Sequence, residues 1–131
     1  MERAVFVYTT YPSAVEAEKA GAAIVGQRLA ACVNILPGMI SHYWWEGKVE
    51  RGEEAVMILK TRASLAGRVT EAVKASHPYT TPAILVLPLE SVGSSVWGYA
   101  SPQIAQRHGE LSALDARLAT PTQMGSRASA R

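Results

Sequence analysis

The sequence lacks the features of several large classes of protein. It has one cysteine, Cys32, so no disulfide can form within the chain, and this usage is typical of a reducing compartment. No apolar run approaches the roughly 20 residues of a transmembrane helix. The first residues, MERAVFVYTTYP, lack the long apolar segment and the small-residue cleavage site of a signal peptide. We therefore expect a cytoplasmic protein that has no membrane partner.

An excess of charge is also missing from most of the chain. Residues 1–106 contain nine Lys and Arg against nine Asp and Glu, and the net charge of +2 comes from residues 107–131. A neutral body lacks the basic surface of a nucleic-acid-binding protein, so we expect no nucleic-acid partner.

Motifs that carry catalysis are absent as well. The chain has no glycine-rich phosphate loop, no Ser-His-Asp arrangement with supporting context, and no CxxC or HxxxH spacing. The adjacent Glu53 and Glu54 belong to a predicted strand, where neighbours face opposite sides and do not converge on one substrate. We therefore expect a binding protein and not an enzyme.

What the sequence does contain is a regular alternation of strand and helix signals. The Ser13 capping box starts a helix that runs toward Leu29, with Val15 and Ala22 in its apolar repeat. Pro37-Gly38 predicts a bend or bulge within one long strand, and Glu46-Gly47 predicts a hairpin turn. The remaining predictions are strands over 4–10, 53–61 and 83–89 and a helix over 64–76, with Ser64 as its cap.

This order, β-α-β-β-α-β, predicts an α+β fold of the ferredoxin-like type. Both helices would cover one face of a four-stranded antiparallel sheet. The apolar strands and the hairpin residues Tyr43, Trp44 and Trp45 would then leave a bare second face, which predicts a closed cyclic oligomer. We expect one domain over 1–107, then an extension over 108–131 that is disordered or helical near 110–119.

Several blocks of sequence together resemble one known family. YPS, LAACVNILPG, SHYWWEGK, MILKT and SHPYTTPAILVLPL are similar, in that order and spacing, to the divalent-cation-tolerance proteins known as CutA. The resemblance implies a homotrimer with the architecture of PII signalling proteins, in which the hairpin pairs with a neighbouring subunit. It also implies an association with divalent cations, copper above all.

The resemblance and the residue chemistry together give His77 and Cys32 as candidate metal ligands. Some bacterial members carry cysteine at Thr9 and histidine at Ser76, which with His77 would form a soft ligand set, and many carry glutamate at Ala83. Because only His77 is kept, we expect Cu²⁺ or another divalent cation to bind weakly. The alternative interpretations are a structural role for His77, which Pro78 holds extended, and a buried apolar role for Cys32.

A second hypothesis is a pocket between subunits. Tyr43, Trp45, Lys60 and Tyr79, with His77, would supply aromatic walls and one cation for a small anionic or organic ligand, as in a PII-like sensor. These aromatics could equally form the interface core. A third hypothesis is a structural trimer that engages a protein partner through its C-terminal extension.

Overall fold

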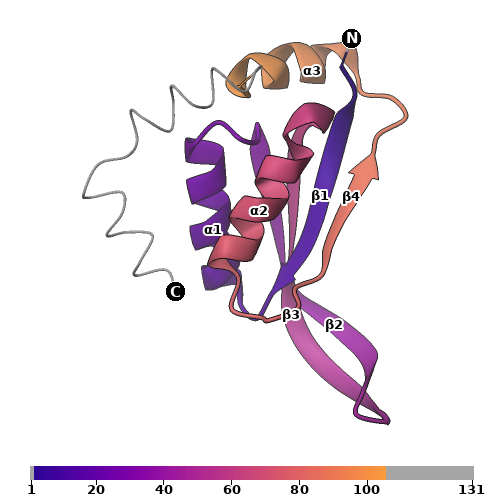
Figure 1. Cartoon of the computed structure of the whole chain (residues 1–131). Helices are drawn as coiled ribbons and strands as arrows, with labels where there is room; N and C mark the ends of the chain where they lie inside the picture. Colours follow the sequence, from indigo (N-terminus) through magenta and orange to yellow (C-terminus); the bar gives the residue numbers. More distant parts are fainter. Residues whose placement is uncertain (1, 106–131) are drawn as a thin grey trace, which may run out of the picture.

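A four-stranded antiparallel sheet with two helices packed on one face dominates the computed structural model, which describes residues 2–105 (Figure 1). The strand order is β2-β3-β1-β4. The elements are β1 (Ala4–Tyr11), α1 (Ala14–Gly26), β2 (Cys32–Trp45), β3 (Lys48–Arg62), the 3-10 turn η1 (Ala63–Leu65), α2 (Ala66–Ser76), β4 (Ile84–Pro88), α3 (Ser94–Ala100) and the 3-10 turn η2 (Ser101–Gln103).

The first six main elements confirm the predicted β-α-β-β-α-β order. Helix α3 was not predicted, and the helix expected near 110–119 lies outside the described residues, as does the 107/108 boundary. No helix within residues 2–105 is long and apolar enough to cross a bilayer.

Helix α1 begins at the predicted capping box, where the Ser13 hydroxyl accepts the Glu16 N–H at 3.3 Å. The predicted apolar repeat through Val15 and Ala22 is wrong, because both residues are exposed. Small residues form most of the buried face instead: Ala17, Ala20, Gly21 and Ile24.

Close approach to the sheet explains these small residues. A Cβ atom at Gly21 would lie 3.1 Å from the Met57 sulfur and 3.1 Å from the Val33 methyls. Size and not apolar character therefore marks the face of α1 that meets the sheet.

Strands β2 and β3 form a hairpin that extends well beyond the other strands (Figure 1). The predicted turn is confirmed: Glu46 and Gly47 both have positive φ, 49° and 78°. The predicted bulge is confirmed too, because the register shifts between Leu36 and Met39, across Pro37-Gly38. We call residues 39–54, beyond this bulge, the hairpin arm.

Helix α2 is preceded by the 3-10 turn η1. The prediction that Ser64 caps α2 is wrong. Leu65 occupies the cap position and gives no side-chain hydrogen bond. The Ser64 N–H instead donates to the Glu2 carboxylate at 2.9 Å, so this residue ties the start of the chain to the turn.

The two faces of the sheet differ in what covers them. The core lies between the helices and the strand residues Val7, Met57 and Leu59, all fully buried. No described helix packs across the middle of the other face, which we call the open face. By strand register and alternation it carries Phe6, Tyr8, Cys32, Asn34, Leu36, Val56, Ile58, Lys60, Leu85 and Leu87.

Strand β4 lies at the edge of the sheet and not in its centre. Its near-continuous apolar sequence is typical of a strand buried on both faces, but in a single chain Leu85 is 57% exposed. The tip of the hairpin arm is equally bare, since Trp44 and Trp45 are 75% and 62% exposed.

We expect Val7→Ala to lower the free energy of unfolding by about 2 kcal/mol, because it removes two methyl groups and leaves a cavity in the core. The matched control is Val15→Ala, since Val15 is 73% exposed on α1, and its effect should stay within about 0.5 kcal/mol. Urea unfolding at one protein concentration measures both. Equal effects would contradict the assignment of the two positions.

Candidate functional site

The His77 ring is held by two hydrogen bonds in the single chain. His77 ends α2 in an extended conformation, φ −82° and ψ 135°, as Pro78 predicts. Its Nδ1 accepts the Tyr79 N–H at 3.1 Å, so Nε2 carries the proton and donates to the Thr10 carbonyl at 2.6 Å. The ring thus links α2 and the loop that follows it to strand β1.

Two aromatic rings contact this imidazole, Tyr11 stacked on it and Tyr79 tilted against it. The Tyr11 ring lies 4.3 Å and the Tyr79 ring 4.9 Å from its centroid. Burial raises the pKa of Tyr11. Burial also raises the pKa of Tyr79, and the carboxylate of Glu54, which accepts the Tyr79 hydroxyl at 3.2 Å, raises it further. Both phenols therefore stay neutral at physiological pH and act as hydrogen-bonding rings.

The metal-ligand predictions lie far apart in the fold. Cys32 is half-buried on the open face, and its cross-strand neighbour is Lys60, whose ammonium lies 5.9 Å from the Phe6 ring centroid. His77 would have to give up one ring hydrogen bond to coordinate a metal. Within residues 2–105, no three His, Cys, Asp or Glu side chains group closely enough to hold a metal ion. The described part of one chain therefore supplies no complete site, and the roles of His77 and Cys32 stay predictions.

The residues predicted for an inter-subunit pocket are also separated within one chain. Tyr43 and Trp45 lie in the hairpin arm, opposite Glu50 and Lys48. Tyr79 contacts Glu54, six residues along β3 from Lys60, which is about 20 Å on a regular strand. His77 and Tyr79 meet, and the Tyr43 phenol lies near enough to Tyr79 to contribute to its raised pKa. Lys60 is remote from this group, so a pocket of all five would require more than one copy.

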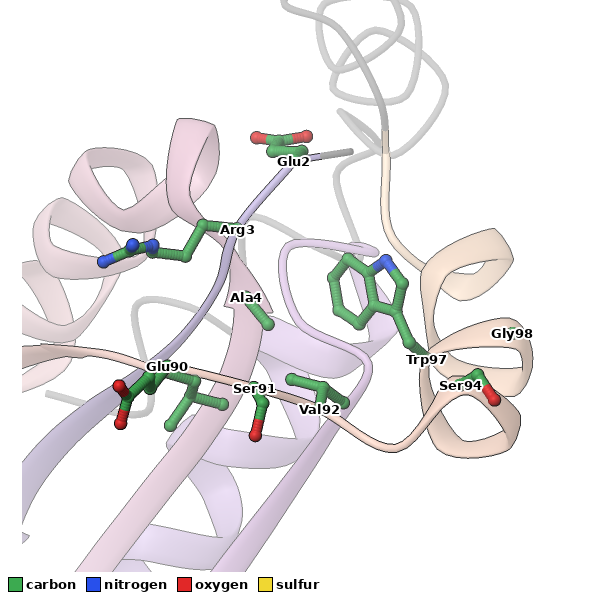
Figure 2. Close-up of a pocket in the computed structure, with 10 residues that line it drawn as sticks. Glu2, Arg3, Ala4, Glu90, Ser91, Val92, Ser94, Trp97 and Gly98 are labelled. Carbon is green, nitrogen blue, oxygen red and sulfur yellow. The ribbon is translucent and has the colours of Figure 1, made fainter.

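Sequence reasoning missed a cleft of about 540 Å³ at the end of the sheet opposite the hairpin arm (Figures 1 and 2). We call it the Trp97 cleft. Its walls come from the start of β1, the segment after β4, and α3: Glu2, Arg3, Ala4, Leu89, Glu90, Ser91, Val92, Ser94, Trp97 and Gly98. The signal available in the sequence is an isolated tryptophan between Gly93 and Gly98.

Arg62 positions the tryptophan of this cleft. Its guanidinium carbon lies 5.6 Å from the Trp97 ring centroid, and its Nη2 donates to the Ser101 carbonyl at 2.6 Å. The Arg62 Nη1 and a Glu2 carboxylate oxygen are 3.5 Å apart. Partial burial acts to raise the pKa of Glu2, but hydrogen bonds from Ser64 and the charge of Arg62 outweigh it, so that pKa is lowered.

A family model, curated relatives and solved structures that are similar to this chain all carry the name of one family. Residues 5–102 match the family model described as "CutA1 divalent ion tolerance protein". The "Divalent-cation tolerance protein CutA" of Archaeoglobus fulgidus is 48% identical over 85 residues, which are 65% of this chain and 82% of that protein.

Rice provides a relative and a solved structure. "Protein CutA 1, chloroplastic" of Oryza sativa subsp. japonica is 45% identical over 86 residues, 66% of this chain and 49% of that protein, so the match spans about half of its length. The crystal structure of CutA1 from Oryza sativa has a TM-score of 0.77 and 37% identity, and the match covers 81% of this chain and 97% of that one.

We expect His77→Ala to lower the free energy of unfolding by about 2 kcal/mol, because it removes two hydrogen bonds and two ring contacts. Lys19→Ala is the control: Lys19 is exposed on α1, away from the open face, and its loss should cost no more than about 0.5 kcal/mol. Thermal and urea unfolding measure both variants. A His77 variant as stable as the control would show that the ring is not structural.

Proposed function

This chain belongs to the CutA1 divalent ion tolerance family, and from that premise we propose that it binds divalent cations as a homotrimer and is not an enzyme. The observation that carries the proposal is the open face, an apolar sheet surface that includes Cys32. In the part of one chain that the structure describes, no three His, Cys, Asp or Glu side chains are grouped to hold a metal. The lone cysteine supports a cytoplasmic setting.

The free strand edges favour a ring of copies. Strands β2 and β4 are the two edges of the sheet, so each chain offers two different surfaces for strand pairing. Pairing one edge with the other edge of the next copy is a head-to-tail contact, which closes into a ring. Such a ring would also bring the open faces together and remove their apolar side chains from water.

Cation binding would then draw ligands from several copies. Cys32 thiolates suit Zn²⁺ and copper, and a ring would place the thiols of its members near the shared axis or the interfaces. The neighbouring Lys60 ammonium would repel a dication at this position, so we expect binding to be weak. His77 remains the second candidate, at the cost of one of its hydrogen bonds.

The assembly is tested by light scattering after size exclusion. We expect the wild type at three times the 14.0 kDa chain mass, and Leu85→Arg at the mass of one chain, because a buried unpaired charge is costly. Val15→Arg, on the exposed side of α1, is the control and should remain trimeric. A wild-type monomer would contradict the ring and every site that depends on it.

The cation is tested by calorimetric titration with Zn²⁺, which is redox-inert, and then with Cu²⁺. We expect saturation at one ion or fewer per chain and at least a tenfold rise in Kd for Cys32→Ser, about 1.4 kcal/mol. Parallel titrations of His77→Gln and His42→Ala show whether either ring takes part. Affinity unchanged in both the Cys32 and His77 variants would exclude both residues as ligands.

A further inference from the structure

We propose that the Trp97 cleft is a binding site for a small, planar, uncharged aromatic molecule, independent of the cation function. Its volume of about 540 Å³ lies within the range of roughly 300–1,000 Å³ that is typical of small-molecule sites. The cleft is formed by a single chain, so it does not depend on the proposed ring.

The inner surface of the cleft is apolar. In Figure 2, Ala4, Val92 and the Trp97 indole face the space between β1 and α3, whereas the charged ends of Arg3 and Glu90 point away from the indole. A charged ligand beside the indole would lose hydration without gaining a partner on this apolar part of the walls, so we expect an uncharged molecule.

The indole is held in place before any ligand arrives. Arg62 lies over the Trp97 ring and is itself fixed by Glu2 and by the Ser101 carbonyl. The segment after α3 is also anchored, because Ile104 is buried in the core. A ring that is already ordered can stack on a flat ligand without a further loss of side-chain entropy, which favours aromatic compounds over aliphatic ones of equal size.

The cleft also offers hydroxyl groups for a polar edge on the ligand. Ser91 and Ser94 line it, and both residues are exposed. A hydroxyl can donate or accept a hydrogen bond, so these two side chains would accept an aromatic ring that carries one amine or hydroxyl group.

Gly98 lines the cleft, so a large side chain at this position should narrow it. A Cβ atom at Gly98 would meet no atom within 4 Å, so Leu can be accommodated without displacing the walls. Glycine is a poor helix residue, so Gly98→Leu should not weaken α3. Gly67→Leu is the matched control, because Gly67 is an exposed glycine of α2 with equal freedom and lies outside the cleft.

The probe is N-phenyl-1-naphthylamine, an uncharged dye that fluoresces in apolar surroundings, compared with its sulfonated relative 8-anilinonaphthalene-1-sulfonate. We expect saturable binding of the uncharged dye at one molecule per chain, with energy transfer from tryptophan. The Kd should rise at least tenfold in Gly98→Leu and stay unchanged in Gly67→Leu. The sulfonated dye should bind the wild type at least tenfold more weakly.

Two results would overturn the proposal. Binding of the uncharged dye that is not saturable, or that is equally strong in Gly98→Leu, would place the dye on the open face or the hairpin arm and not in the cleft. Equal affinity for the two dyes would overturn the assignment of an uncharged ligand.

Discussion

Removal of one sheet face from water is the constraint on which the rest of this structure depends. The helices α1 and α2 cover a single face, and the other carries apolar side chains along all four strands. Soluble monomers seldom leave so continuous an apolar surface exposed. The two free strand edges and the tryptophans of the hairpin arm are also exposed in a single chain, and the proposed ring would bury them together. In the proposed ring, contact between copies would therefore come before any cation site.

Much of the fold was predictable because its signals are local. Proline, glycine and the capping serine mark the element boundaries, and alternating apolar residues mark the strands. The failures arise where the decisive contact is distant in sequence. The buried face of α1 is set by the approach of Met57 and Val33 to Gly21, which no heptad count reveals. The position of β4 at an edge follows from its pairing with β1, about 80 residues earlier.

The candidate sites show the same division between local and distant effects. The extended backbone of His77 was predictable from Pro78 alone, but its bond to the Thr10 carbonyl joins residues 67 positions apart. The cross-strand contact of Cys32 with Lys60 depends on the hairpin register, which the bulge alters. The Trp97 cleft combines the two ends of the described chain, so no sequence window contains it. Sequence therefore indicates which side chains are stiff or reactive, and tertiary structure decides which of them meet.

The bulge in β2 determines how the hairpin arm responds to a change of chain length. Strand β2 uses three steps from Leu36 to Met39, where β3 uses two from Val56 to Glu54. Because directly paired residues share a side of the sheet, the bulge absorbs the extra residue and keeps the arm in phase with β3, with Trp44 opposite Val49 and Trp45 opposite Lys48. Loss of a single residue at 37 or 38 would therefore remove the bulge and leave each tryptophan on its present side. Since a bulge bends and twists its strand, chain length at this point would set the direction in which the arm extends and not the side chains that it presents.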